Sequence, residues 1–361
     1  MGGRLVALDR PGGPAFVEEL QRIWAAGDAA FPVDQRLPAA ARGRLAERMD
    51  VGGEIDEGDA LVVATSGSSG EPKGVVLTHE AIAASALATS ARLEVRSEDH
   101  WLACLPLSHV GGLSVVTRAL VTGTPLTVHP GFDAAAVDAS GATLVSLVAT
   151  ALGRIRADRF RTIVLGGSRP PADRPANTVA TYGMTETGSG VVYDGVPLDG
   201  VEVRIERARA ADDDDDGGGE ILLRGPMLMR GYRDGTTAID ADGWLHTGDI
   251  GRWHPDGRLH VIGRAGDLII TGGENVWPEA VERLLGDHPS VADVLVRGID
   301  DAEWGQLVEA MVVPTEGAAP PTLAELRDFV KQTAPAHLAP RRLLLVEALP
   351  RTSLGKLRRG R

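Results

Sequence analysis

The stretch ALVVATSGSSGEPKGVVLTH (residues 60–79) joins an apolar run to a loop rich in glycine and hydroxyl groups. The apolar run predicts a buried strand. Glycines let a backbone come close to an oxyanion, and hydroxyl, main-chain N–H and lysine groups bind phosphate oxygens. The loop is therefore a candidate phosphate-binding loop, although a plain Gly/Ser surface turn has a similar composition. Its candidate ligands are Thr65, Ser66, Gly67, Ser68, Ser69, Gly70 and Lys73.

The spacing of this loop argues against a Walker-type phosphate loop, which needs Gly, four residues, and then Gly-Lys-Ser/Thr. Here Pro72 precedes Lys73 and Gly74 follows it. Proline also removes a backbone N–H that a Walker loop would use. Kinase-like P-loop interpretations are therefore disfavoured.

Composition narrows the class of protein. The 361 residues carry a formal net charge of −13, whereas non-specific nucleic-acid binding needs a basic face. Cys104 is the single cysteine, which precludes an intrachain disulfide and fits a reducing, cytoplasmic compartment. The sequence predicts no membrane span and no apolar signal core. The acidic run at 212–216 favours a solvated loop over a metal site, because adjacent carboxylates lack the spacing of a calcium loop.

The order of apolar and helical patterns predicts the fold class. Residues 1–60 contain one amphipathic helix candidate, at 15–28, and otherwise loops. Apolar runs alternate with helical patterns from 60 to about 200, which predicts a largely parallel sheet. We therefore expect an α/β protein. A large N-terminal domain (1–263) has α/β sheet layers and a small β-rich subdomain, and a small, mobile α+β C-terminal domain (264–361) follows.

Two predicted strand ends carry groups suited to a nucleotide, because ligands of open α/β sheets bind beyond the carboxyl ends of strands. TIVLGGSRPP (162–171) could place a base against its glycines, and an ordinary turn explains it equally well. ATYGMTETGSG (180–190) offers a tyrosine for a base, a threonine for phosphate and a glutamate for Mg²⁺. A buried Thr–Glu pair is the alternative. The candidate residues are Gly166, Gly167, Ser168, Tyr182, Gly183, Met184, Thr185 and Glu186.

Three further candidates lie in the C-terminal part of the chain. HTGDIG (246–251) places Asp249 at the end of a short strand, where its carboxylate could accept both ribose hydroxyls. Arg264 could reach ribose or phosphate, or pair with a surface acid. Lys356 lies in LPRTSLGKLRRGR (349–361), which could also be an ordinary basic tail.

In this order the motifs resemble the adenylate-forming superfamily of acyl-CoA ligases, peptide-synthetase adenylation domains and luciferases. The resemblance extends from Thr65 to Lys356 and includes TSGSSGEPKGV, PLSHVGGL, YGMTE, GEILLRGPMLMRGY, GWLHTGDIG, GRAGDLIITGGENVWPEAVE and PRTSLGK. Within the superfamily, SLVATAL (146–152), VVYDGVPLDGV and TGGENVWPEAVE are most similar to the o-succinylbenzoate–CoA ligases. The chain is shorter at its front end than typical members.

The resemblance implies a reaction in two steps. The substrate carboxylate attacks the α-phosphorus of ATP, and CoA then displaces AMP from the acyl-adenylate. Lys356 would bridge the carboxylate and the α-phosphate, while Glu186 would hold Mg²⁺. Residues 65–74 would clamp the β- and γ-phosphates, with Thr185 on the α-phosphate. Asp249 and Arg264 would hold the ribose, and Tyr182 with the 166–168 turn would frame adenine.

The resemblance also assigns the acyl and CoA sites. His109 would lie near the reacting carboxylate, with Thr150 in the acyl pocket. Arg118 would hold the second carboxylate of o-succinylbenzoate, although a surface arginine on a helix is an equal alternative. The C-terminal domain would rotate about Gly266, and the CoA channel residues would be Gly272, Gly273 and Glu274.

The implied partners are small molecules: a carboxylic acid, ATP and CoA. A homodimer is compatible with the sequence. Another aryl- or fatty-acyl-CoA ligase is the main alternative, and a non-catalytic adenylate-binding protein is a remote one.

Overall fold

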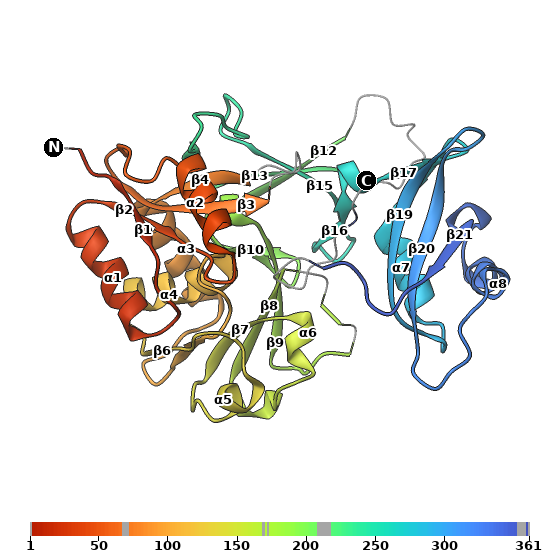
Figure 1. Ribbon diagram of the computed structural model, residues 1–361, viewed down its shortest axis with the longest axis horizontal. Helices are drawn as coiled ribbons and strands as arrows, with labels where there is room; N and C mark the ends of the chain where they lie inside the picture. Colours follow the sequence, from red (N-terminus) through yellow and green to blue (C-terminus); the bar gives the residue numbers. More distant parts are fainter. Residues whose placement is uncertain are drawn as a thin grey trace. The chain divides into compact units, whose positions relative to one another are not determined.

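The structure is a computed structural model that describes residues 2–66, 72–167, 170–171, 173–207, 218–351 and 359 (Figure 1). The chain divides into two compact units. Unit 1 consists of Met1–Arg204 and Leu222–His246, and unit 2 of Ile205–Ile221 and Thr247–Arg361.

The first sheet of unit 1 contains the residues on both sides of the glycine-rich stretch. Its order is β1-β2-β3-β4-β14, with parallel β1–β2 and β2–β3 pairs and antiparallel β3–β4 and β4–β14 pairs. The β3–β4 pairing places Thr65 opposite Lys73. The strands are β1 (Leu5–Leu8), β2 (Ala29–Pro32), β3 (Asp59–Ser66), β4 (Pro72–Thr78) and β14 (Gly231–Tyr232).

The second sheet of unit 1 has seven strands in the order β11-β10-β9-β8-β7-β5-β6. Strands β6, β5, β7, β8 and β9 are mutually parallel, whereas β10 and β11 are antiparallel additions. The largely parallel sheet predicted from the alternating pattern is thereby confirmed. The strands are β5 (Trp101–Ala103), β6 (Leu126–Val128), β7 (Leu144–Val148), β8 (Thr162–Gly166), β9 (Thr178–Gly183), β10 (Gly190–Tyr193) and β11 (Val196–Pro197).

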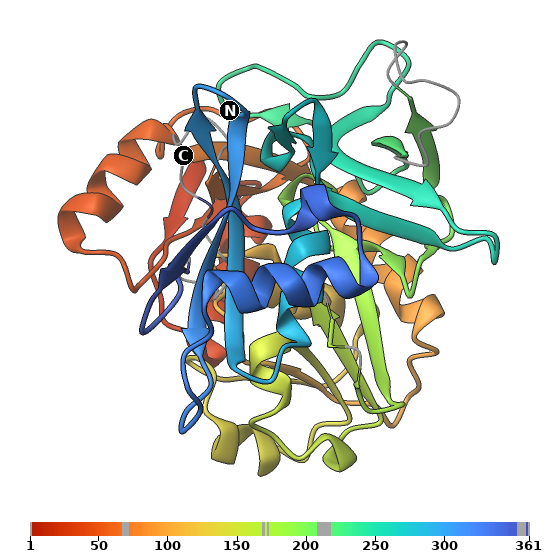
Figure 2. The same cartoon turned by 90° about the vertical axis from the view of Figure 1, so that its right-hand side faces the viewer.

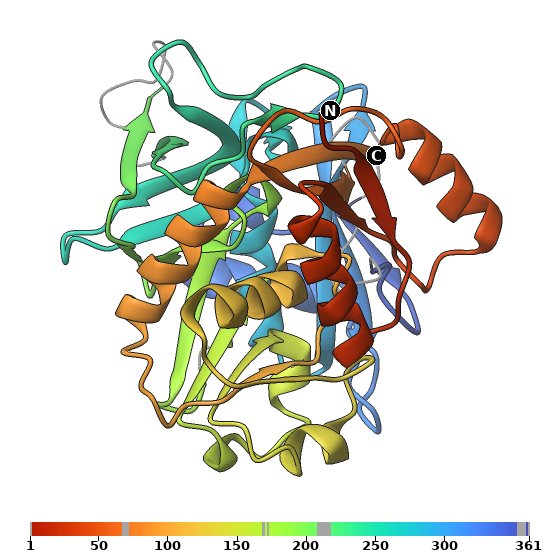
Figure 3. The same ribbon diagram turned by 90° about the vertical axis from the view of Figure 1, so that its left-hand side faces the viewer.

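Helices of unit 1 pack on these sheets. Helix α3 lies against α4, and α4 packs on β5 and β7 (Figure 3). Thr78 caps α3, since its hydroxyl accepts a hydrogen bond from the Ala81 amide at 3.1 Å. The helices are α1 (Pro14–Ala25), α2 (Ala39–Arg48), α3 (His79–Arg92), α4 (Val110–Thr122), α5 (Ala134–Asp138) and α6 (Ala149–Leu152).

Four strands form a smaller sheet, in the order β12-β13-β15-β16. These strands are β12 (Glu202–Glu206), β13 (Gly219–Arg224), β15 (Leu245–Trp253) and β16 (Leu259–Arg264). This sheet lies in the region where the sequence predicts a β-rich subdomain.

The remaining part of unit 2 is an α+β fold. Helices α7 and α8 lie beside each other, and their apolar residues share one core with alternate residues of β19 and β20 (Figure 2). The residues that alternate into this core are on one face of the sheet, so both helices cover that face. The elements are β17 (Ile269–Thr271), β18 (Glu274–Val276), α7 (Pro278–Gly286), β19 (Val291–Asp301), β20 (Gly305–Pro314), α8 (Leu323–Thr333) and β21 (Arg342–Leu345).

The mixed α/β class is confirmed, but the prediction for residues 1–60 was wrong. Besides the expected helix, that region forms β1, β2 and α2. The two strands are only four residues long, and the sequence of β2, AAFP, has low intrinsic β propensity. Pairing with neighbouring strands, rather than local pattern, determines them. The boundary expected at 263–264 stays a prediction. Among the described residues, no helix has the length and apolarity that a membrane crossing needs.

Candidate functional site

The flanks of the glycine-rich stretch are ordered strands. Thr65 ends β3 and Lys73 lies at the start of β4, opposite each other in the antiparallel pair. Gly67, Ser68, Ser69 and Gly70 lie outside the described residues, as does the side chain of Ser66.

Three predicted segments of unit 1 meet at one edge of its seven-stranded sheet. Strands β7, β8 and β9 are adjacent and parallel, so their carboxyl ends lie together. Thr150 follows β7. Gly166 ends β8, and Gly167 comes directly after it. Tyr182 and Gly183 end β9. The 3-10 helix η2 (Thr185–Thr187) comes next and carries Glu186. This is the edge at which ligands of open α/β sheets bind. Ser168 lies outside the described residues.

Gly183 also has a structural reason to be glycine. A Cβ at this position would meet the carbonyl oxygen of Ser189 at 2.2 Å. That distance is too short for any other residue, because β10 crosses here close to β9. Beside it, the Met184 amide donates to the Thr187 hydroxyl at 3.0 Å, which fixes the start of η2.

Glu186 is held by a tyrosine that the sequence analysis did not select. The Tyr232 hydroxyl donates to Oε1 of Glu186 at 3.0 Å. The Nζ of Lys73 lies 4.4 Å from the centroid of the Tyr232 ring, as in a cation–π contact. Tyr232 therefore links the candidate phosphate lysine to the candidate magnesium carboxylate. A single oriented carboxylate fits Mg²⁺, which takes one or two carboxylates together with phosphate oxygens.

His109 lies just before helix α4 and contacts an ion pair from the loop after β2. Its Nε2 lies 3.0 Å from Nη2 of Arg36 and 3.7 Å from Oδ2 of Asp34. Burial lowers the pKa of His109, Arg36 lowers it further, and Asp34 opposes both. Neither Asp34 nor Arg36 belongs to a recognisable motif, so sequence alone gave no signal for them.

Arg118 lies on α4 and is 3% exposed, which excludes the alternative of a surface arginine. Its guanidinium stacks over Trp101, with Cζ 4.8 Å from the ring centroid. Nε and Nη1 are buried without a hydrogen-bond partner among the described residues. Burial lowers the pKa of Arg118, and Tyr193 opposes that shift.

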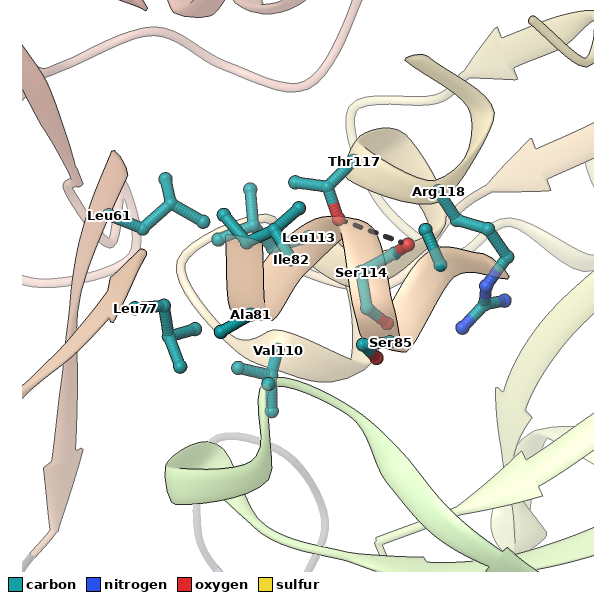
Figure 4. Close-up of a pocket in the computed structure, with 12 residues that line it drawn as sticks. Leu61, Leu77, Ala81, Ile82, Ser85, Val110, Leu113, Ser114, Thr117 and Arg118 are labelled. Atoms are coloured by element: carbon teal, nitrogen blue, oxygen red, sulfur yellow. Dashed lines mark hydrogen bonds between the residues drawn. The ribbon is translucent and has the colours of Figure 1, made fainter. Parts of the chain in front are cut away.

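A small cavity lies between α3 and α4, and Arg118 forms part of its wall (Figure 4). Hydroxyl groups of Ser85, Ser114 and Thr117 share the wall with apolar side chains. The volume is about 10 Å³, room for roughly one water molecule. A buried cation that has no partner among the residues the structure describes is suited to an anionic or carbonyl oxygen.

The candidate ribose residues belong to unit 2. Asp249 lies within β15 rather than at the end of a short strand, so that detail of the prediction was wrong. It pairs in register with Arg264 of β16, and Nε of Arg264 lies 2.7 Å from Oδ1 of Asp249. The Asp249 amide donates to the Thr247 hydroxyl at 3.0 Å. The two candidate residues thus form one preorganised ion pair.

The predicted hinge and CoA residues also lie in unit 2. Gly266 lies in the 3-10 helix η3 (Ala265–Asp267). Gly272 and Gly273 form the turn of the β17–β18 hairpin with φ of 60° and 85°. Two consecutive positive φ angles are typical of a type I′ turn, which favours glycine at its central positions. Glu274 follows at the start of β18 and is exposed.

Lys356 lies outside the described residues, but arginines on both sides of its segment have partners in unit 2. Arg351 pairs with Asp293. Arg359 contacts three carboxylates at 2.7–3.2 Å, those of Asp267, Glu279 and Glu282. At Arg359, therefore, the basic tail forms ion pairs with unit 2 and is not an ordinary solvated tail.

The AMP-binding enzyme family matches residues 50–233, and its C-terminal domain matches 280–356. The chain belongs to the AMP-binding enzyme family. It is 38% identical to a protein of Mycobacterium tuberculosis named probable 2-succinylbenzoate–CoA ligase, over 98% of this chain and 96% of that protein. It is 35% identical to 2-succinylbenzoate–CoA ligase of Bacillus cereus, over 82% and 68% of the two chains.

Solved structures agree with the family. One is o-succinylbenzoate CoA synthetase (MenE) of Bacillus subtilis in complex with the acyl-adenylate OSB-AMP. Its TM-score is 0.85 and its identity 28%, covering 98% of this chain and 86% of that one. The same enzyme with ATP and magnesium has a TM-score of 0.83 at 27% identity, covering 98% and 87%. The resemblance to adenylate-forming enzymes, and among them to the succinylbenzoate ligases, is confirmed.

Proposed function

We propose that this chain is an AMP-forming acid–CoA ligase whose acid is 2-succinylbenzoate, also called o-succinylbenzoate. The acid carboxylate attacks the α-phosphorus of ATP, and pyrophosphate leaves. The CoA thiol then attacks the acyl carbonyl, its proton is lost, and AMP leaves. The products are 2-succinylbenzoyl-CoA, AMP and pyrophosphate. The similarity to ligases of that name over nearly the whole of both chains supports the reaction.

Our choice of 2-succinylbenzoate as the acid rests on the surroundings of Arg118. 2-Succinylbenzoate has two carboxylates, and only one of them reacts. The other needs a cation, and Arg118 has two buried nitrogen atoms, Nε and Nη1, that lack partners among the described residues. Since the cavity beside it holds roughly one water, side chains there must move to admit the acid. His109 then orients the reacting carboxylate, and Thr150 lines the acyl pocket.

The roles of the nucleotide-binding residues follow from the family resemblance. The stretch 65–74, with Lys73, clamps the β- and γ-phosphates, and Thr185 binds the α-phosphate. Tyr182 and the 166–168 turn frame adenine. Asp249 accepts the ribose hydroxyls, since a carboxylate accepts two hydrogen bonds. Mg²⁺, when held by Glu186, neutralises charge on the pyrophosphate oxygens as they leave.

Lys356 supplies positive charge where two anions meet in the first step. The second step requires the lysine to leave and the thiol to enter. We place the hinge for this domain rotation at Gly266, and Gly272, Gly273 and Glu274 in the CoA channel. A glycine hinge bends with little steric cost.

A panel of carboxylic acids with ATP and CoA, analysed by mass spectrometry of the thioester, tests the function. We expect 2-succinylbenzoyl-CoA as the main product. Another aryl or fatty acid that gives the higher kcat/KM would contradict the choice of acid. A wild-type protein without ATP–pyrophosphate exchange on any acid would support a non-catalytic adenylate-binding protein.

Two substitutions test the residues proposed for adenylation and for the choice of acid. Lys356→Ala is expected to abolish acid-dependent ATP–pyrophosphate exchange while nucleotide binding, measured by calorimetry, persists. Arg118→Ala is expected to reduce turnover of 2-succinylbenzoate far more than turnover of benzoate. Equal losses on both acids would count against a carboxylate role for Arg118.

The proposed substrates are small molecules, and we propose a cytoplasmic reaction because a cytoplasmic enzyme has access to ATP and CoA. We also propose that the chain can assemble as a homodimer, which light scattering at several protein concentrations would test. A constant monomer mass would refute the dimer and leave the ligase proposal untouched.

A further inference from the structure

Three polar side chains meet where the loop after β2 approaches the start of α4. Arg36 is gripped by Asp34, because its Nε lies 2.8 Å from Oδ1 and its Nη2 lies 2.7 Å from Oδ2. The Arg36 amide also donates to Oδ1 at 3.0 Å. The same Nη2 lies 3.0 Å from Nε2 of His109. A carboxylate that holds a guanidinium at two points fixes its direction, so Arg36 is aimed at the imidazole.

This contact determines which imidazole nitrogen carries the proton. Every nitrogen of an arginine side chain is a donor and none accepts. His109 Nε2 must therefore present its lone pair to Arg36. In a neutral imidazole the proton is then on Nδ1, an assignment that follows from the hydrogen bond. The structure gives Nδ1 no partner among the described residues.

We propose that Arg36 is a positioning residue that holds His109 as the neutral Nδ1–H tautomer, ready to donate a hydrogen bond to the acyl substrate. The proposal rests on the function proposed above, in which His109 meets the reacting carboxylate. Neither Arg36 nor Asp34 needs to touch the substrate for this role.

The charges around His109 support the neutral form. Burial lowers the pKa of His109 and the Arg36 guanidinium lowers it further, whereas Asp34 acts in the opposite direction. Burial also disfavours the ionised form of Asp34, but hydrogen bonds from Arg36 outweigh it and keep the pKa of Asp34 below its ordinary value. Asp34 thus remains anionic and bonded to Arg36, and its effect on the pKa of His109 is outweighed by burial and by the Arg36 charge.

A neutral donor suits the first step better than a cation would. An imidazolium would form an ion pair with the free carboxylate, stabilise that ground state and reduce its nucleophilicity. Only interactions that strengthen in the transition state accelerate the reaction. A neutral N–H orients one carboxylate oxygen while leaving most of the negative charge available for attack on phosphorus.

NMR of the histidine ring nitrogens tests the tautomer without any substrate. The chain has nine histidines, and the signals of His109 are identified as those that disappear from the spectrum of His109→Asn. We expect wild-type His109 to show the Nδ1–H pattern at neutral pH, with a pKa below that of an exposed histidine. Arg36→Gln should mix the tautomers and raise the pKa of His109, because Asp34 then faces the ring alone. An Nε2–H pattern in the wild type would overturn the proposal.

Two further variants control this experiment. Arg44→Gln makes the same change on the exposed face of α2, and it should leave the His109 signals and the activity unchanged. Arg36→Lys keeps the cation but loses the two-point grip of Asp34, so it should give an intermediate tautomer mixture. It also keeps the proposal falsifiable if Arg36→Gln does not fold. A His109 spectrum that stays wild-type in Arg36→Lys and Arg36→Gln would overturn it.

Kinetics test the role of the tautomer. In ATP–pyrophosphate exchange, Arg36→Gln should raise KM for the acid by about fivefold, the effect of weakening one hydrogen bond. KM for ATP should not change. Because the pKa of His109 rises, the acid limb of kcat/KM should move to higher pH. An unchanged KM and an unchanged acid limb would refute the positioning role. If wild type lacks exchange on every acid, the proposed function fails, whereas the NMR result stands independently.

Discussion

Replacing Arg118 by methionine should stabilise the free protein while it weakens the enzyme. Two donor nitrogen atoms of Arg118, Nε and Nη1, are buried and without partners among the described residues. Each unsatisfied donor costs about 1–3 kcal/mol. The cation–π contact with Trp101 offsets about 2 kcal/mol of this cost. Methionine fills a similar volume without polar atoms. We therefore expect the free energy of unfolding to rise by about 2 kcal/mol.

Arg161→Met is the matched control, because this arginine has a buried partner. Its Nε lies 2.9 Å from Oδ1 of Asp99, whose side chain is 1% exposed. Removing Arg161 leaves a buried carboxylate uncompensated, so the free energy of unfolding should fall by about 3 kcal/mol. The two substitutions are chemically identical and should have opposite effects on stability.

Urea denaturation followed by tryptophan fluorescence measures both effects. With an m-value of about 3 kcal/mol/M, Arg118→Met should move the midpoint upward by about 0.7 M. Its kcat/KM on 2-succinylbenzoate should fall at least tenfold. If Arg118→Met lowers the midpoint and keeps wild-type turnover, Arg118 is a structural residue and our argument is wrong.

Three other predictions follow from individual contacts. Tyr232→Phe removes the hydroxyl that donates to Glu186. We expect ATP–pyrophosphate exchange to need a higher Mg²⁺ concentration, and calorimetry to show weaker Mg²⁺-dependent ATP binding. An unchanged Mg²⁺ titration would contradict this. Burial raises the pKa of Cys104 to about 12, so iodoacetamide at pH 8 should label it only after unfolding, and rapid labelling of the native protein would show that the thiol is accessible. Burial opposes ionisation of Asp99, but Arg161 and its other hydrogen-bond partners hold its pKa at about 2. The stability that this carboxylate contributes, about 1–2 kcal/mol after allowance for screening, is therefore complete above pH 4 and lost as pH falls toward 2. Asp99→Asn should remove that part of the acid dependence.

The sequence predicted the fold where the pattern was local. Alternating apolar and helical segments were enough for β5 to β9 and for α7 and α8, because each segment is amphipathic or apolar by itself. β1 and β2 were missed because four residues carry little periodicity, and their pairing with β3 decides their conformation. Glu186 and Lys73 could be selected as candidates because their neighbours in sequence form part of the signature.

The residues that orient the site come from distant segments and could not be found in this way. Arg36 and His109 are 73 residues apart in sequence, and Glu186 and Tyr232 are 46 apart. Each pair exists only because the sheets bring separate loops together. Arg36 lies in no quoted motif, whereas Tyr232 ends the signature GEILLRGPMLMRGY, which marks its segment but not its contact with Glu186. The group that acts on substrate is thus easier to predict than the group that positions it.

Arg118, which is buried, and Arg161, which is half-buried, make the same point in energetic terms. Arg118 follows SVVT and Arg161 precedes TIVLGG, so each is a cation beside an apolar run. Sequence alone assigns both the same cost of burial. The structure distinguishes them, because Asp99 compensates Arg161 within the protein, whereas the described residues leave two donor nitrogen atoms of Arg118 unsatisfied. A buried cation without a partner favours the binding of an anion. We therefore propose that the second carboxylate of the acid substrate pairs with Arg118.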